Sequence, residues 1–248
     1  MSPIIKSRIK QQIDIFRKSF LQSQGLAFDN FFQPTALPGL SRTPPHKRSS
    51  VFPPLVTLKA FIFQVLSDDG SCKQAVASVL VDRIVDGQSA NTVNTGPYCK
   101  ARQRLPLKQL TEAATTAGMR LHQQTPEVWR FKGYNVVLTD GATVQMPDTP
   151  ENQADFPQPD SQKPGLGFPI ARLVVLISLA AATVMDYSLG AYQGKGSGET
   201  SLLSQLFGSL SAGDLLMADR YYCTFAIIAL MQALGVPVLF PLYMPGKK

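Results

Sequence analysis

An apolar run that is interrupted only by Ser and Thr spans residues 173–185, between Arg172 and Asp186. It has 13 residues, whereas a transmembrane helix needs roughly 20, so we expect it to be buried in a globular core. The first 18 residues are polar and amphipathic and do not form a secretory leader. Cys72, Cys99 and Cys223 form no Cys-x-x-Cys pair, which argues against a zinc site or a disulfide framework. These features predict a cytoplasmic protein without membrane contact.

The charge of the chain is divided unequally between its two halves. Residues 1–130 hold 17 Lys and Arg against 8 Asp and Glu, a net charge of +9, and the remainder carries −2. In a chain of 248 residues, long enough for two domains, this division predicts a polyanion-binding region joined to a different module. Charge that merely solvates the surface is the alternative.

Hydrophobic spacing divides the chain at about the same place. Helices are predicted over residues 4–21, 55–66, 72–85 and 107–123, with an irregular connector over 31–54. Residues 98–105 carry Lys100, Arg102 and Arg104 at alternate positions. We therefore expect residues 1–130 to be a basic, mainly helical DNA-binding region. The three basic side chains are candidates for phosphate contacts, and a solvated edge is the alternative.

Residues 131–248 have the pattern of a mixed α/β domain. Strands are predicted over 134–139 and 143–146, separated by an Asp-Gly turn at 140–141, and over 171–185 as a long strand or a strand pair. A Pro-rich loop is expected over 147–169 and a Gly-rich connector over 190–198. Helices over 199–210 and 222–234 then alternate with strands over 214–218 and 237–243. Such an order predicts a central sheet with helices packed on it.

Two aspartates follow predicted strands of this sheet. Asp140 comes after the strand at 134–139, and Asp219 comes after the strand at 214–218. Side chains at strand ends point into the crevice where α/β proteins bind ligands, and carboxylates are suitable ligands for divalent metal ions. Each has a structural alternative: Asp140 as a turn residue and Asp219 as the N-cap of the following helix. His46 and His122 have no nucleophile near them in the sequence.

Three segments resemble a known family. Residues 138–153 (LTDGATVQMPDTPENQ) and 213–225 (GDLLMADRYYCTF) resemble the segments around the first and second catalytic aspartates of insertion-sequence transposases of the fourth family. Residues 98–106 (YCKARQRLP) resemble that family's upstream basic segment. The resemblance implies a ribonuclease-H-like fold, Mg²⁺- or Mn²⁺-dependent DNA cleavage and strand transfer, and binding of transposon ends and target DNA. It also implies that Asp140 and Asp219 are metal ligands and that the full-length protein is a homodimer.

The family's third metal ligand is a glutamate in a Tyr-x-x-Arg-x-x-x-Glu-x-x-x-x-x-x-Lys pattern, and no Glu follows Asp219 here. We therefore expect a partial ribonuclease-H-like domain that ends before this glutamate, which leaves open whether the chain is an active enzyme. One alternative is a non-catalytic DNA-binding fragment that occupies transposon ends or modulates full-length transposase. Another is a two-metal nuclease that recruits Asp148 or Glu199 as its third ligand.

Overall fold

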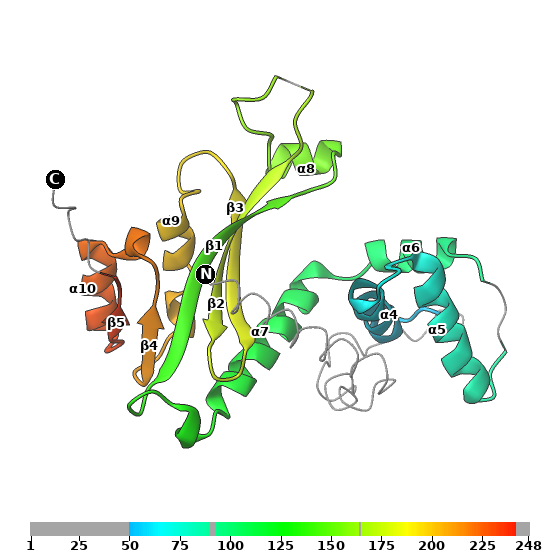
Figure 1. Cartoon of the computed structure of the whole chain (residues 1–248). Helices are drawn as coiled ribbons and strands as arrows, with labels where there is room; N and C mark the ends of the chain where they lie inside the picture. The colour runs from blue at the N-terminus through cyan, green and yellow to red at the C-terminus, as the bar shows by residue number, and fades with distance from the viewer. Residues whose placement is uncertain (1–49, 90–92, 164, 242–248) are drawn as a thin grey trace. The chain divides into compact units, whose positions relative to one another are not determined.

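The computed structural model describes residues 50–89, 93–163 and 165–241 (Figure 1). The helix predicted over residues 4–21 lies outside them. The chain forms two compact units, Met1–Thr111 and Glu112–Lys248. The division falls within helix α7 (Leu107–Gln123), about twenty residues before the domain boundary expected from the sequence. None of the described helices is long and apolar enough to cross a membrane.

The first unit contains three described helices, α4 (Pro54–Leu66), α5 (Cys72–Val85) and α6 (Gly96–Gln103). The first two confirm the helices predicted there. Ser71 caps α5 by accepting a hydrogen bond from the Gln74 amide at 3.1 Å. The buried residues come from all three helices and the segment before α4: Phe52, Ala60, Ala75, Val76, Val79, Leu80, Tyr98 and Ala101.

The second unit is built on a five-stranded sheet in the order β3-β2-β1-β4-β5. The strands are β1 (Asn135–Gln145), β2 (Ile170–Ser178), β3 (Thr183–Ala191), β4 (Asp214–Met217) and β5 (Val238–Leu239). The first three form an antiparallel meander, and β4 and β5 are added parallel to β1. This is the topology of a ribonuclease-H-like sheet, as predicted. The run at 173–185 is a strand pair, because Ser178 ends β2 and Thr183 begins β3.

Short helices connect the strands. A 3₁₀ turn (η1, Glu127–Trp129) precedes β1, and α8 (Pro150–Asp155) lies in the segment predicted to be a loop. The elements α9 (Glu199–Ser204) and η2 (Phe207–Ser209) join β3 to β4, and η3 (Arg220–Tyr222) and α10 (Phe225–Ala233) join β4 to β5. Each predicted helix in this part is therefore present, in a shorter form.

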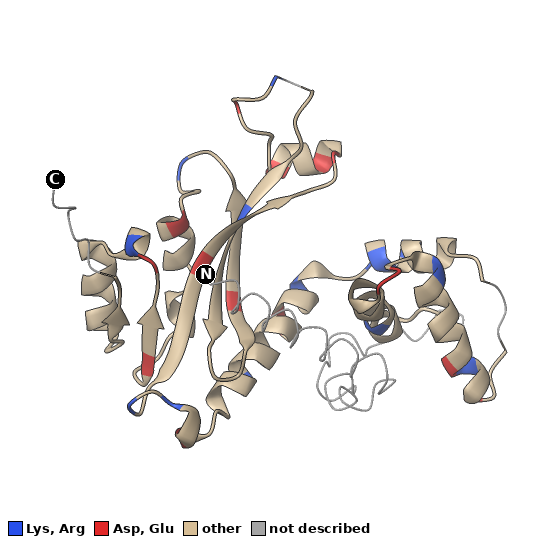
Figure 2. Cartoon of the chain, viewed as in Figure 1, with Lys and Arg blue, Asp and Glu red and all other residues tan. Residues whose placement is uncertain are grey.

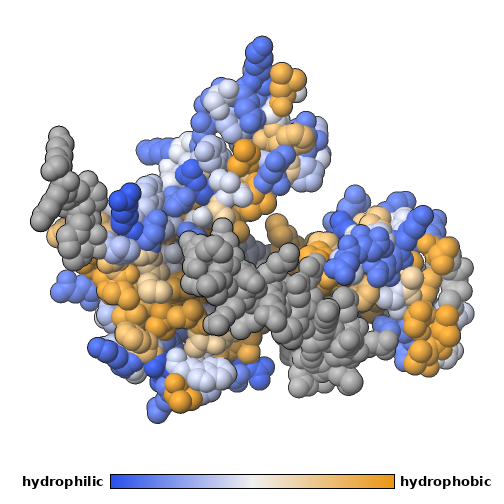
Figure 3. Space-filling model, in the orientation of Figure 1, coloured by the Kyte–Doolittle hydropathy of each residue, from blue (hydrophilic) through white to orange (hydrophobic). Residues whose placement is uncertain are grey.

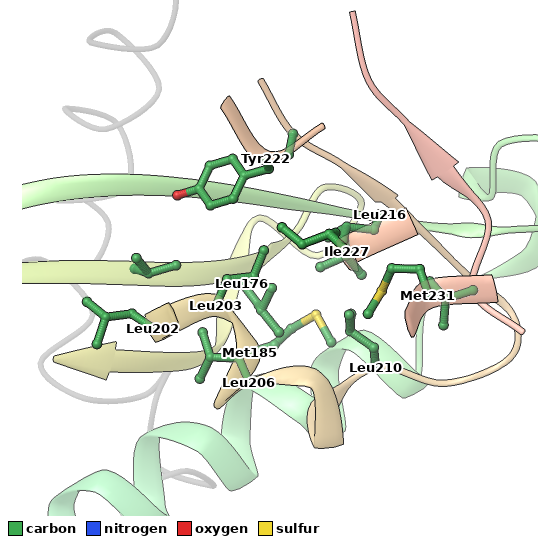
Figure 4. Packing of buried hydrophobic residues seen from close by; sticks show 14 residues of the cluster. Leu176, Met185, Leu202, Leu203, Leu206, Leu210, Leu216, Tyr222, Ile227 and Met231 are labelled. Atoms are coloured by element: carbon green, nitrogen blue, oxygen red, sulfur yellow. The ribbon is translucent and has the colours of Figure 1, made fainter. Parts of the chain in front are cut away.

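The main core lies on one face of the sheet, against α9 and α10. Leu176 of β2 and Met185 of β3 are fully buried there, next to side chains of the two helices (Figure 4). The helical contributors are Leu202, Leu203, Leu206, Ile227 and Met231. Because side chains alternate along a strand, the intervening residues Leu138, Val175 and Ile177 point to the opposite face and remain half-buried.

That opposite face is apolar and partly exposed. Val184 and Leu189 on β3 and Leu239 on β5 are 40–48% exposed, and the strand register places them level with half-buried apolar residues of β2 and β4. Figure 3 shows apolar surface gathered over the sheet-bearing unit.

Candidate active site

Asp140 lies on β1, and Asp219 lies two residues past the end of β4, the neighbouring parallel strand. Strands β1 and β4 pair in a register that sets Leu138 opposite Met217. Asp140 lies two residues after Leu138, and Asp219 lies two residues after Met217. Both pairs of residues are therefore separated by the same 79 positions in the sequence. The two carboxylates therefore emerge at one level of the sheet, at the carboxyl end of β4. Figure 2 shows acidic residues, in red, on β1, at the start of α9 and after β4 in this part of the unit.

Of the two structural alternatives for these aspartates, the structure contains the N-cap at Asp219 but not the turn at Asp140. Asp140 is not in a turn, because β1 continues without interruption to Gln145, and its Oδ1 accepts the Gly141 amide at 2.8 Å. Asp219 does cap a helix: its Oδ1 accepts the Tyr221 amide at 2.8 Å at the start of η3. Both residues are exposed, and a carboxylate that accepts one such bond keeps its second oxygen for another partner.

Glu199, one of the two alternative third ligands, lies over Gly141, the residue after Asp140. It is the first residue of α9, and its carboxyl carbon lies 2.4 Å from where a Cβ on Gly141 would be. Glycine at 141 therefore provides the space that the Glu199 side chain occupies. Asp148, the other candidate third ligand, lies beyond the end of β1 and accepts a hydrogen bond from Gln153 at 2.8 Å.

Tyr222 contacts Glu199 and experiences the charge of both aspartates. Its ring is buried, and its hydroxyl donates a hydrogen bond to Glu199 Oε2 at 3.2 Å. Burial raises the pKa of the Tyr222 phenol well above its usual range, and the negative charges of Glu199, Asp140 and Asp219 raise it further. The phenol consequently stays protonated and available as a donor at neutral pH.

The carboxylates of Asp140 and Asp219 are hard oxygen donors, the type of ligand that divalent metal ions prefer. Asp219 also borders a surface pocket with Arg220, Tyr221, Cys223 and Pro241. Within the described ranges, however, no group of three Asp, Glu, His or Cys residues is arranged so that it could hold a metal ion. The arrangement provides a partial ligand set of two carboxylates, with Glu199 near it.

The three candidate phosphate-binding residues do not share one surface. Residues 96–103 form a helix instead of an extended segment, so alternate positions point to opposite sides. Lys100 and Arg104 are exposed and line one pocket together with Asn94 and Gly96. Arg102 instead points into the unit. Its guanidinium carbon lies 4.7 Å from the centre of the Phe61 ring, and its Nη1 donates to Gln64 Oε1 at 3.0 Å.

A second constellation was missed because its members are far apart in the sequence. His122 of α7 lies between Ser178 Oγ, 2.9 Å from Nδ1, and Asp214 Oδ1, 2.9 Å from Nε2. All three residues are at least 97% buried, so no substrate reaches them despite the Ser-His-Asp composition. Asp214 also accepts hydrogen bonds from Ser211. This network holds the end of α7 against the sheet. His46 lies outside the described residues.

Comparison with known proteins gives two similarities. Over 130 residues the chain is 27% identical to Transposase InsG for insertion sequence element IS4 from Escherichia coli (strain K12), covering 52% of this chain and 28% of that protein. The chain thus spans well under half of this relative. A structure titled Mos1 transposase paired-end complex with left transposon end matches 80% of this chain and 61% of that chain, with 13% identity and a TM-score of 0.30. At that score it adds nothing to the strand order described above. No family model matches.

Proposed function

We propose that this chain, a relative of bacterial insertion-sequence transposases over about half its length, acts in DNA transposition. In this proposal it binds transposon ends and target DNA, and its second unit performs metal-assisted phosphodiester cleavage and strand transfer. One observation carries the catalytic part of the proposal. Asp140 and Asp219 are 79 positions apart, and each stands in a segment that resembles the family's catalytic segments. The register of β1 with β4 brings Asp140, on β1, and Asp219, just past β4, to one level of the sheet.

Asp140 and Asp219 would hold Mg²⁺ or Mn²⁺. When bound, the ion polarises the phosphodiester and helps to activate the attacking hydroxyl. The contribution of this chain is geometric: the β1–β4 register sets the two carboxylates at one level, and the Gly141 and Tyr221 amides each fix one carboxylate oxygen. Glu199 is kept close by the Tyr222 hydroxyl.

We assign DNA binding to the first unit and to Lys100 and Arg104 within it. Both are exposed on one side of α6 and border the same pocket. Phosphate contacts of this kind give affinity without sequence preference and weaken as counterions compete. Arg102, stacked on Phe61 and bonded to Gln64, has a structural role in this assignment.

A double substitution tests this assignment. In Lys100→Ala/Arg104→Ala, duplex DNA should bind more weakly at every sequence. The slope of log affinity against log salt should flatten by about 1.8, from about 0.9 for each lost phosphate contact. Fluorescence anisotropy at several salt concentrations measures both quantities. Arg102→Ala is the matched control: it should leave the slope unchanged and lower the stability of the first unit. If the double variant keeps the wild-type slope, α6 does not contact DNA.

A second candidate function is DNA binding without cleavage, as a protein that occupies transposon ends. It is favoured by the lack of a three-ligand metal group among the described residues. Incubating the purified chain with supercoiled plasmid carrying the element's ends, in Mg²⁺ or Mn²⁺, separates the two candidates. Nicking that requires the metal and disappears in Asp140→Asn supports the enzyme, whereas binding to the ends without nicking supports the second candidate.

Glu199 is the residue through which this chain could complete its own site, and Gly141→Ala tests that role. The added Cβ would lie 2.4–2.8 Å from the Glu199 carboxyl group, so the flexible side chain must move away. We expect a stability change within about 1 kcal/mol but weaker Mn²⁺ binding, read from the electron paramagnetic resonance signal of free Mn²⁺. Gly208→Ala is the matched control, since a Cβ there meets nothing within 4 Å. Equal Mn²⁺ affinity in both variants would exclude Glu199 from the site.

A further inference from the structure

Two cysteines from different helices of the first unit meet side by side. Cys72 begins α5 and Cys99 lies in α6, and their Sγ atoms are 3.9 Å apart. Both are free thiols and both are partly exposed. A disulfide bond is about 2.05 Å long, so bond formation requires the two sulfurs to approach by about 2 Å. Residues 72 and 99, the cysteine pair, are thus already neighbours although 27 positions apart in the sequence.

The surroundings of the two sulfurs are unequal. The Cys72 sulfur accepts hydrogen bonds from three donors. These are Gln64 Nε2 at 3.6 Å, Arg102 Nη1 at 3.9 Å and the Cys99 thiol. It also occupies the first position of a helix. A helix N-terminus and a neighbouring arginine are typical surroundings of reactive cysteines.

Cys99 has the complementary position. Its S–H is the donor toward Cys72, and burial together with the contact to Cys72 raises the pKa of the Cys99 thiol above its usual value. Cys99 therefore keeps its thiol hydrogen and uses it to donate a hydrogen bond to the Cys72 sulfur. One sulfur is set up to react first and the other to react second, which is the division of roles in reversible thiol oxidation.

We propose that the cysteine pair is a redox modification site, at which a peroxide oxidises Cys72 and Cys99 then closes a disulfide. In the first step the Cys72 sulfur attacks one oxygen of hydrogen peroxide: the O–O bond breaks and an S–O bond forms, which gives a sulfenic acid. The other peroxide oxygen leaves as water and takes the hydrogen of the Cys72 thiol. In the second step the Cys99 sulfur attacks the Cys72 sulfur. The S–S bond forms as the S–O bond breaks, and the hydroxyl leaves as a second water with the Cys99 hydrogen. Overall, two thiols lose two electrons and two hydrogens, and the peroxide is reduced.

The disulfide would cross-link α5 to α6, the helix that carries Lys100 and Arg104. It would also remove the sulfur acceptor from Arg102, which keeps its contacts with Gln64 and Phe61. A thiol such as glutathione or dithiothreitol reverses the bond. The proposal stands independently of the transposition role, because it rests on the geometry of the first unit alone.

The test uses the full chain in a Cys223→Ser background, because Cys223 is exposed and would otherwise form intermolecular disulfides. After treatment with hydrogen peroxide, free thiols should fall from two to none per monomer, and the intact mass should fall by two hydrogens. Peptide mapping should show Cys72 joined to Cys99, and dithiothreitol should restore both thiols. Two free thiols remaining, or oxidation that stops at sulfinic acid, would overturn the proposal.

Single substitutions test the order of the two steps. With Cys99→Ser in the same background, Cys72 should be trapped as a sulfenic acid that reacts with dimedone, whereas Cys72→Ser should give little dimedone product at Cys99. In the wild-type chain, Cys72 should react with peroxide at least about tenfold faster than Cys223, which is exposed and lies at the C-terminal end of a 3₁₀ helix instead of the N-terminus of an α-helix. Equal rates at Cys72 and Cys223 would contradict the assigned roles.

Discussion

Replacing Asp140 or Asp219 by Asn is expected to reduce Mn²⁺ affinity at least about tenfold, because the affinity of an oxygen site depends on the number of charged ligands. Where DNA nicking is measurable, the same substitutions should lower its rate by about 10²-fold or more, since small displacements of reacting groups have effects of that size. Mn²⁺ binding is measured from the electron paramagnetic resonance signal of the free ion. This measurement remains informative even if the chain does not cut DNA.

Asparagine is the informative substitute because it removes charge and keeps the local hydrogen bonds. Its amide oxygen can still accept the Gly141 amide at position 140 and the Tyr221 amide at position 219. Asparagine is also a good N-cap residue, so η3 should keep its start. A loss of Mn²⁺ binding in Asp219→Asn would therefore report on the carboxylate itself and not on the cap.

Asp155→Asn is the matched control, since Asp155 is exposed at the end of α8, away from the β1–β4 strand pair. It should bind Mn²⁺ as the wild type does. If Asp140→Asn and Asp219→Asn behave like this control, the two aspartates are structural residues and the proposed metal site is wrong.

His122→Ala is expected to lower the free energy of unfolding by about 3 kcal/mol, the largest stability effect predicted for this chain. The substitution removes His122 Nε2, the hydrogen-bond partner of the buried Asp214 Oδ1. The loss of a partner by a buried charged group typically lowers the free energy of unfolding by about 3–5 kcal/mol. A carboxylate can only accept, so Nε2 donates to Asp214, and the Ser178 hydroxyl is suited to donate to Nδ1. Urea unfolding followed by circular dichroism measures the change.

Two further variants separate the network from a general effect of substitution in α7. Ser178→Ala should cost about 1 kcal/mol, the typical contribution of one hydrogen bond between neutral groups. Gln123→Ala changes the exposed neighbour of His122 and should stay within about 0.5 kcal/mol of the wild type. If His122→Ala unfolds at the same urea concentration as Gln123→Ala, the network does not hold α7 to the sheet.

The hydrophobic pattern predicted most of the elements in the described residues. The helix predicted over 72–85 and the one over 107–123 have the predicted bounds, and the strand predicted over 214–218 is one residue shorter. The Asp-Gly pair at 140–141 was misread as a turn, because the sequence could not show that β1 pairs with β2 as far as Gln145. In the basic segment, residues 96–103 form a helix and Arg104 caps it, so the three charges at alternate positions do not share one side.

By itself the sequence determined the α/β class of the second unit, the helical character of the first, and the two aspartates as a pair worth testing. These depend on local spacing and on short segments, which a linear sequence contains. Only the tertiary structure decided that Asp140 and Asp219 lie at one level, that Glu199 lies above Gly141, and that His122 joins Ser178 to Asp214. It also separated Arg102 from Lys100 and Arg104 and brought Cys72 to Cys99. The physical reason is that strand register and helix packing set contacts between residues tens of positions apart, and these contacts arise from the burial of the whole core rather than from any local pattern.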